Sequence, residues 1–321
     1  MHEIDVLLRD RRVMHRAEVA RISSRATLKR RIDDGRWWRP SYRTVALTDI
    51  DADDAFWFEV ALAHTWPDGA LTGEAMLFVL GRHPNLPDQI QLSIPRWSRA
   101  THDGRLRLHK VVDQRSSTRW LAGRPLRVDL GATSVALTAL AADSETASWL
   151  AIDAVNSPHG VSLQRRLEHG GPLLAKLRAL DRSGTSELVD VAGAAVAGCQ
   201  SPGEIEVWKI LTSLRIEFEV QKRWLVPTRD RTLVRSRSIY SDFWLPSLRA
   251  VLEVDSQLHD HLSDVRRDTW LRRRRVRTLR FVGRDSFTAP EDFRHDVVCG
   301  LVSLGWRPGL DDSATRVPRS A

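Results

Sequence analysis

The chain has 321 residues, of which 42% are hydrophobic and 28% charged, so its composition excludes a disordered tail protein or a fibre. Its two cysteines, Cys199 and Cys299, are too few for a disulfide framework or a four-thiolate zinc site. No apolar stretch approaches the roughly 20 residues of a membrane span, and the opening MHEIDVLLRD lacks the apolar core of a signal peptide. We therefore expect a cytoplasmic protein of about two domains that has no membrane partner.

The positive charge is concentrated in two segments of the chain, whose formal net charge is +8. Residues 1–48 carry 12 basic and 6 acidic side chains and residues 201–284 carry 18 and 11, whereas the remainder carries 19 and 24. Clustered Lys and Arg are typical of proteins that bind nucleic-acid phosphates. An arginine-rich composition with no such function is the alternative, but the segregation favours DNA as a partner.

Residues 1–48 have the pattern of a winged helix-turn-helix. Two short helices lead to a break at Ser23-Ser24, and a third helix is predicted over 25–34, with Ser24 as its N-cap and Gly35 just beyond its end. Two short strands of a wing are predicted over 37–40 and 42–47. The same pattern would also suit a three-helix interaction module that binds no nucleic acid.

The third helix is predicted to have an apolar and a basic face. The inward residues are Ala26, Leu28 and Ile32, and the basic residues expected to contact DNA are Arg25, Lys29 and Arg31. The string from Leu8 to Ala20 and the Gly35-Arg36-Trp37 turn resemble the N-terminal winged helix of AbiEi-type antitoxins and their actinobacterial relatives. This resemblance implies a module that binds promoter DNA, and it covers less than a sixth of the chain.

Residues 49–200 are predicted to form a mixed α/β middle region. The predicted strands are 89–95 and 105–111, and the predicted helices are 55–64, 70–80, 135–141, 147–155, 163–169 and 173–180. We assign no chemistry here, because His102 and His109 are isolated and the chain has neither a GxxxxGK[ST] nor a GxGxxG motif. Residues 309–321 are expected to be a flexible tail.

Residues 201–308 are predicted to form a further α/β domain. It opens at Ser201 with a capping box, in which Glu204 occupies the third helical position. The predicted strands are 218–224, 238–245, 249–255 and 276–282, and a further helix is predicted over 264–274.

Acidic side chains recur in two of these strands. If the strands form a hairpin around Pro246, their alternation allows Asp242 to lie near Glu253 and Asp255. Three converging carboxylates repel one another, and a hard cation such as Mg²⁺ or Mn²⁺ relieves that repulsion. His259 follows the second strand and could shuttle a proton. The spacing alone equally suits edge-strand acids that pair with the many arginines.

The same residues resemble the PD-(D/E)XK nuclease superfamily, in particular its very-short-patch-repair-like branch. The matching positions are Glu204, Gln221, Asp242-Phe243, Glu253-Val254-Asp255, His259, Asp264, Arg267-Asp268, Leu271 and Arg280-Phe281. The resemblance implies a restriction-endonuclease-like fold, with a central mixed sheet flanked by helices. It implies that Asp242, Glu253 and Asp255 bind the metal and that His259 assists catalysis. Glu204 would be an auxiliary acid or only a capping residue.

The sequence departs from this branch at Ser256 and Arg275, where glycines are usual, and it lacks the superfamily's catalytic lysine. A basic run close to the acids is expected to contact DNA, although a solvated charged helix is the alternative. The basic residues concerned are Arg272, Arg273, Arg274 and Arg277.

The sequence therefore predicts a DNA-binding, Mg²⁺-dependent endonuclease of α+β fold, acting in phage defence, a toxin–antitoxin pair or DNA repair. The alternative is a non-catalytic regulator or antitoxin that keeps a degenerate nuclease fold as a binding scaffold. A module that binds a partner protein of a defence locus is a third interpretation, and a homodimer is also left open.

Overall fold

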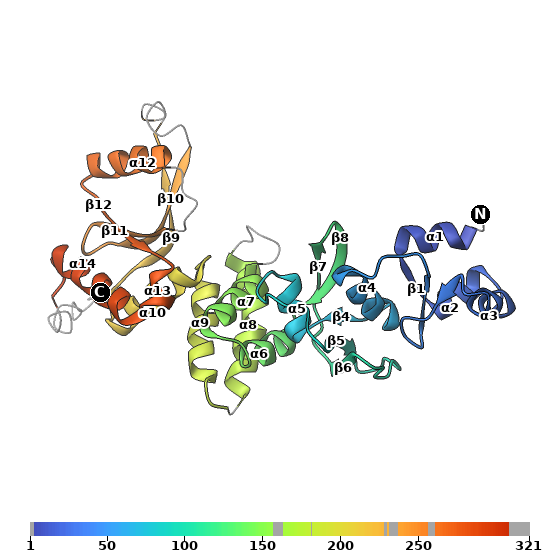
Figure 1. Ribbon diagram of the computed structural model, residues 1–321. Coiled ribbons are helices and arrows are strands. Elements are labelled where there is room, and N and C mark those ends of the chain that lie inside the picture. The colour runs from blue at the N-terminus through green and yellow to red at the C-terminus, as the bar shows by residue number, and fades with distance from the viewer. Residues whose placement is uncertain are drawn as a thin grey trace. The chain divides into compact units, whose positions relative to one another are not determined.

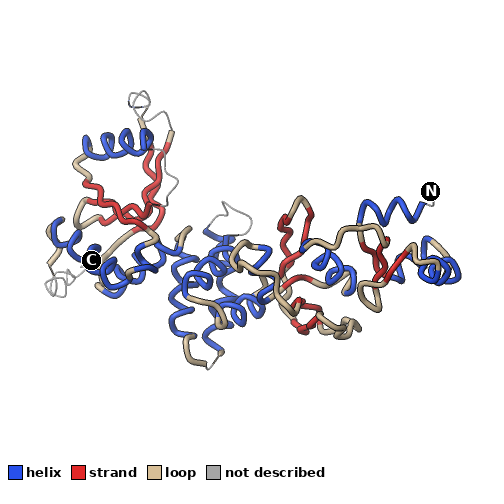
Figure 2. The backbone as a smooth tube through the Cα atoms, viewed as in Figure 1, coloured by secondary structure: helices blue, strands red, loops and turns tan. Residues whose placement is uncertain are grey.

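The computed structural model describes residues 3–156, 163–180, 182–227, 230, 237–255 and 261–307, without the side chains of 163 and 261–264. The protein has a mixed α/β fold, as predicted, and divides into two compact units. The first comprises Met1–Ser157 and Gly171–Thr185, and the second comprises Pro158–Gly170 and Ser186–Ala321. Figure 1 labels their elements and Figure 2 distinguishes helix from strand. None of the described helices is long and apolar enough to cross a membrane.

The first unit begins with the element order expected of a winged helix, with one additional short strand, β1. Its strands form an antiparallel sheet in the order β1-β3-β2. The elements are α1 (Glu3–Arg11), β1 (Val13–His15), α2 (Arg16–Ile22), α3 (Arg25–Asp33), β2 (Trp37–Trp38) and β3 (Thr44–Leu47).

The α3 helix begins where the sequence predicts, because the Ser24 hydroxyl accepts the backbone N–H of Thr27 at 3.0 Å. Leu28 is buried in the core of this region and Ile32 packs against it. The prediction that Ala26 faces inward is wrong, because its side chain is exposed. Residues two positions apart in an α-helix lie about 200° apart around its axis. Because Leu28 faces the core, Ala26 therefore faces outward.

The first unit continues with a five-stranded sheet in the order β6-β5-β4-β8-β7 and several helices. Its strands are β4 (Ala70–Leu71), β5 (Ile90–Pro95), β6 (Leu106–Val111), β7 (Ser116–Leu121) and β8 (Arg124–Asp129). The helices are α4 (Asp54–His64), α5 (Gly73–Val79), α6 (Ala132–Ala139), α7 (Ser144–Asn156) and α8 (Leu163–Ala179), of which α8 extends into the second unit.

Three predictions for this region need correction. The segment 70–80 is not one helix, because Ala70 and Leu71 pair in the sheet and the helix starts only at Gly73, whose φ is +58°. Strands β7 and β8 were not predicted, because their sequences SSTRWL and RPLRVD contain few apolar residues among polar and charged ones. The two helices predicted over 163–169 and 173–180 are one helix, which continues through Pro172.

The second unit is built on a mixed four-stranded sheet in the order β12-β11-β10-β9. Only β11 and β12 are parallel. The strands are β9 (Glu219–Leu225), β10 (Ser238–Leu245), β11 (Ala250–Asp255) and β12 (Arg277–Val282). The helices are α9 (Thr185–Ala197), α10 (Pro202–Ser213), α12 (His261–Arg273), α13 (Asp285–Thr288) and α14 (Pro290–Ser303). The predicted hairpin around Pro246 is confirmed by the pairing of Leu245 with Ala250.

Helices cover both faces of this sheet (Figure 1). On one face, Trp270 and Leu271 of α12 pack with Val251 of β11. On the other, the start of α10 approaches so closely that a Cβ at Gly203 would lie 2.8 Å from Val254 Cγ1, so only glycine fits there. Glu204, the next residue, is thereby held close to the sheet.

Candidate active site

Asp242 lies where strands β10 and β11 stop pairing. The last pair of this ladder is Phe243 with Leu252. One residue further, the Asp242 carboxylate replaces a main-chain acceptor, because its Oδ2 accepts the backbone N–H of Val254 at 2.8 Å. The acid is therefore fixed between the two strands and not on a mobile loop.

Gln221 lies across from Asp242 on the neighbouring strand β9. The pairs on either side, Lys222 with Ser241 and Val220 with Phe243, are formed, but Gln221 itself has a φ of +51°. Such a left-handed conformation costs a non-glycine residue about 1–3 kcal/mol, and strained residues of this kind recur at active sites and ligand contacts. Here it accompanies an amide that lies between two acids. Gln221 Nε2 donates to Glu204 Oε2 at 3.1 Å and lies 3.5 Å from Asp242 Oδ1.

Glu204 caps the helix and also lies beside the other acids of the candidate site. At the helix start, the Ser201 hydroxyl accepts the Glu204 N–H at 3.2 Å and lies 3.0 Å from Glu204 Oε1. The other oxygen, Oε2, accepts the Gln200 N–H and faces Gln221. Burial raises the pKa of Glu204 to about 8, and the negative charge of Asp242 contributes to that increase. The capping residue is therefore also part of the acidic cluster.

Glu253 is the acid of this cluster whose hydrogen bonding is least complete. Its side chain is 3% exposed, and Oε2 pairs with Arg267 Nη2 of α12 at 3.1 Å. Oε1 is buried without a hydrogen-bond partner among the described residues. Burial and the Asp242 charge raise the pKa of Glu253 to about 8, and the opposing effect of Arg267 is smaller. A proton or a cation would stabilise this oxygen.

Asp255 shares a face of β11 with Glu253 but has a different environment. Its Oδ1 accepts from Arg280 Nη1 at 2.9 Å, and Arg280 Nη2 donates to Asp268 Oδ1 at 2.9 Å. Asp255 thus belongs to an ion-pair network that joins β11, β12 and α12. Arg267 and Asp268 connect α12 to the sheet through these contacts.

The structure therefore brings together most of the predicted site. Asp242 lies close enough to Glu204 and Glu253 to raise the pKa of each, and Gln221 joins it to Glu204. Across the described part of the chain, no three His, Cys, Asp or Glu side chains are already arranged as metal ligands. His259 and Ser256 lie outside the described residues.

Cys199 is a neighbour of this cluster that sequence reasoning did not identify. It is fully buried, and burial together with Glu204 and Asp242 raises the pKa of its thiol well above the usual value. A neutral thiol adds no charge next to the acids, so we assign it a packing role. In the sequence, the only indication that Cys199 lies near these acids is its position two residues before the Ser201 cap.

The predicted DNA-contacting residues of α3 are not equivalent. Arg25 and Lys29 are exposed, whereas the Arg31 side chain is 11% exposed and pairs with Asp5 at 3.6 Å. Arg31 therefore faces the body of the first unit rather than solvent, since its guanidinium is engaged with α1.

The arginines after the acidic strands also separate into two groups. Arg272 and Arg273 are exposed at the end of α12. Arg274 stacks on the Trp270 ring, 3.6 Å from its centroid, and Arg277 Nη2 donates to the Leu304 carbonyl. Arg272 and Arg277 line a groove of about 420 Å³ beside β12 and α14. Arg272 and Arg273 are therefore exposed, whereas Arg274 and Arg277 are held by contacts within the unit.

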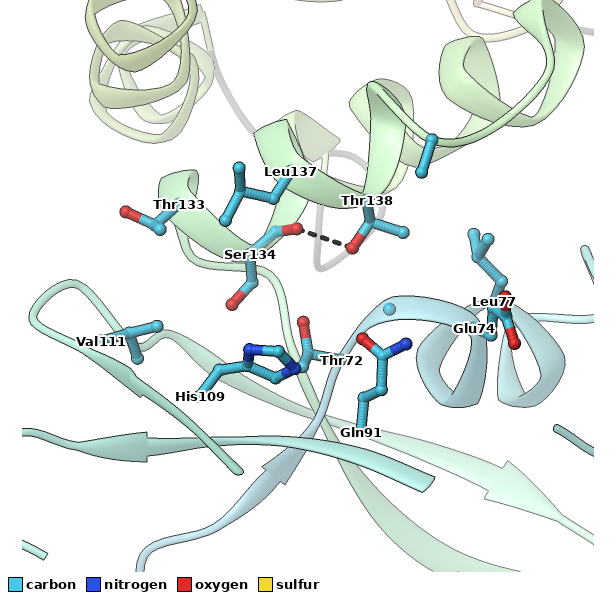
Figure 3. Close-up of a pocket in the computed structure, with 12 residues that line it drawn as sticks. Thr72, Glu74, Leu77, Gln91, His109, Val111, Thr133, Ser134, Leu137 and Thr138 are labelled. Carbon is cyan, nitrogen blue, oxygen red and sulfur yellow. Dashed lines mark hydrogen bonds between the residues drawn. The ribbon is translucent and has the colours of Figure 1, made fainter. Parts of the chain in front are cut away.

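A separate pocket of about 160 Å³ lies in the first unit, between α5, β5, β6 and α6 (Figure 3). Gln91 and His109 face it from the strands. Burial lowers the pKa of His109, and His102 and Arg107 lower it further. The Thr138 hydroxyl at its edge donates to the Ser134 carbonyl at 2.7 Å, a contact internal to α6. We assign this pocket no role.

The sequence matches no protein-family model, and it matches no curated protein.

Proposed function

We propose that this protein binds DNA and hydrolyses phosphodiester bonds with a divalent cation held in the second unit. The observation that supports this most directly is Asp242 between two buried glutamates, each with a pKa of about 8. These raised pKa values mean that the cluster keeps protons near neutral pH when no cation is bound, and one Mg²⁺ or Mn²⁺ ion would stabilise the ionised carboxylates in place of those protons. The buried Glu253 Oε1, which has no described hydrogen-bond partner, suits that interpretation.

Asp242 and Glu253 would hold the cation, with Glu204 nearby. Asp255 could join them only by giving up its pairing with Arg280. When bound, such an ion polarises a phosphodiester and lowers the pKa of water. Gln221 would keep Asp242 oriented through its contacts with both acids. Arg25, Lys29, Arg272 and Arg273 are exposed cations that would contact DNA phosphates.

Calorimetric titration of Mg²⁺ and of Mn²⁺ into the whole chain tests the cation site. We expect saturable binding by the wild type and its loss in Asp242→Asn, whose amide oxygen can still accept the Val254 N–H. Asp296→Asn is a matched control, because Asp296 is an exposed acid on α14 of the same unit. Equal cation binding by all three proteins would contradict the proposed site.

Plasmid nicking in Mg²⁺ tests the chemistry. Loss of one group that stabilises the transition state electrostatically typically lowers the rate by about 10²–10³, so Asp242→Asn should lose at least that much activity and Asp296→Asn should be unchanged. Wild-type protein that binds the cation yet cuts no DNA or RNA would overturn the nuclease proposal and leave the cation site in place.

A second function is supported by the two arginines of the acid cluster. Arg267 and Arg280 already pair with Glu253 and Asp255, so cations of the chain itself offset part of the charge. Together with the missing lysine, this favours a non-catalytic regulator or antitoxin. That alternative predicts DNA binding that needs no divalent ion, survives Asp242→Ala and is lost in Arg25→Ala/Lys29→Ala.

A further inference from the structure

The wing of the first unit is bound to a segment of the middle region, residues 96–103. The Tyr42 N–H donates to Asp103 Oδ2 at 2.9 Å, and Arg43 Nη2 donates to the Arg99 carbonyl at 2.9 Å. The Tyr42 hydroxyl also contacts the hydroxyl of Thr101. These bonds fix the wing and the segment as one surface.

A buried histidine reinforces this connection. His64 is 0% exposed, its Nδ1 lies 2.9 Å from the Ser41 hydroxyl of the wing, and its Nε2 lies 3.0 Å from the Thr101 carbonyl. The Tyr42 ring packs edge-on against it, with centroids 5.1 Å apart. The imidazole therefore bridges the two segments.

The segment begins with a turn that presents an exposed tryptophan between two exposed arginines. Trp97 is 71% exposed, and its neighbours Arg96 and Arg99 are exposed as well. The turn is closed by the Ser98 N–H, which donates to the Pro95 carbonyl at the end of β5 at 2.9 Å. An exposed indole on a closed turn has no packing role and is available to a partner.

The basic surface continues from this turn toward α2. Arg16 Nη1 donates to the Tyr42 carbonyl at 2.9 Å, and the Arg21 guanidinium lies 5.8 Å from the Trp66 ring centroid. Two acids of this region are already engaged. Asp103 accepts the Tyr42 N–H, and Glu18 pairs with Arg11. The arginines of this surface, Arg16, Arg21, Arg43, Arg96 and Arg99, outnumber these two acids.

We propose that the turn 96–99 is a second contact with a nucleic-acid duplex, next to the wing and in addition to α3. Arg96 and Arg99 bind phosphates, and Trp97 packs against the sugars between them. Alternating guanidinium and aromatic groups match a backbone of alternating phosphates and apolar sugars. This inference rests on the DNA binding proposed above, and it assigns part of that binding to the middle region.

Fluorescence anisotropy with a labelled duplex of about three helical turns tests the inference. Removing two phosphate contacts in Arg96→Ala/Arg99→Ala should weaken binding about tenfold near 0.15 M salt and reduce the salt slope by about 2. The matched control is Arg178→Ala/Arg182→Ala, which removes two exposed arginines of the same unit. Trp97→Ala should weaken binding several-fold with an unchanged salt slope, whereas Trp120→Ala, at an equally exposed tryptophan, should not.

Comparison with Arg25→Ala/Lys29→Ala separates the possible failures. If that variant binds more weakly than wild type but Arg96→Ala/Arg99→Ala matches its control, the inference is overturned and DNA binding by α3 stands. An affinity loss without a change in salt slope would also overturn it, because the turn would then only support the wing. Wild-type protein that binds no duplex would overturn both proposals, and capture of an acidic protein instead would identify the surface as a protein interface.

Discussion

Two buried acids, one in each unit, are held in opposite ways. Asp129 at the end of β8 is 0% exposed, and donors surround its carboxylate. Its Oδ1 accepts the backbone N–H groups of Arg115 and Gly131, both at 2.8 Å, and its Oδ2 accepts the Ser134 hydroxyl at 2.5 Å. Glu253 has one ion pair, and its second buried oxygen has no described hydrogen-bond partner.

The difference separates a structural acid from a functional candidate. A buried carboxylate surrounded by donors stabilises a turn and has no remaining need for a ligand. A buried carboxylate with an unsatisfied oxygen and an anionic neighbour must gain a proton or bind a cation. Burial alone therefore does not distinguish Glu253 from Asp129, whereas the number of donors at each carboxylate oxygen does.

Substituting Asp129 tests the structural half of this comparison and should have the largest effect on stability. Asp129→Ala leaves three donors unpaired, two of them in buried hydrogen bonds, so we expect the free energy of unfolding to fall by about 3–5 kcal/mol. Urea denaturation followed by tryptophan fluorescence measures the loss. The control is Asp143→Ala, which removes an exposed acceptor of the Thr146 N–H and should cost about 1 kcal/mol. Equal losses would show that the Asp129 donors find other partners.

The functional half of the comparison predicts a dependence of stability on pH. Because the pKa of Glu204 and of Glu253 is raised to about 8, the folded protein keeps protons that the unfolded chain loses above about pH 4.5. Without divalent cations, these two glutamates should therefore stabilise the folded protein most below pH 4.5. Stability should fall by several kcal/mol as the pH rises to 8, and change little above that.

Asp242→Asn should reduce this pH dependence, because it removes the negative charge that helps raise both pKa values. We expect the variant to exceed wild type by about 1–2 kcal/mol at pH 8 and to match it near pH 4. Differential scanning calorimetry in EDTA at both pH values measures the difference, with Asp296→Asn as the control. A variant that keeps the full decline between pH 4.5 and 8 would mean that Asp242 is not coupled to the glutamates.

Local patterns in the sequence predicted the framework of the site correctly. The bounds 238–245 of β10, the hairpin at Pro246 and the helix start at Ser201 follow from alternation, turn chemistry and capping, all of which depend on neighbouring residues. The departure at Arg275 is also informative. Its φ is +59°, so this arginine adopts the left-handed conformation that usually selects glycine at a helix end.

Packing between distant elements could not be predicted in this way. Alternation places Glu253 and Asp255 on one face of β11, yet only the parallel register with β12 puts Arg280 opposite Glu253 and within reach of Asp255. The pairing of Glu253 with Arg267 depends likewise on how α12 packs on the sheet. Distinguishing the satisfied acid from the unsatisfied one therefore required the tertiary structure.

Substituting Asp255 should have the smallest effect on stability, and it distinguishes most sharply between an anchoring acid and a cation ligand. Its side chain is 31% exposed and its partner Arg280 is 25% exposed, so solvent screens the ion pair. We expect Asp255→Asn to lower the free energy of unfolding by at most about 1 kcal/mol in EDTA, and Asp268→Asn, which removes the other acid of Arg280, to act similarly. Urea denaturation measures both losses, and Mg²⁺ titration of the same proteins then separates the roles of the two acids. If Asp255 only anchors Arg280, both variants bind the cation alike. A loss of cation binding confined to Asp255→Asn would place Asp255 among the ligands, despite its pairing with Arg280.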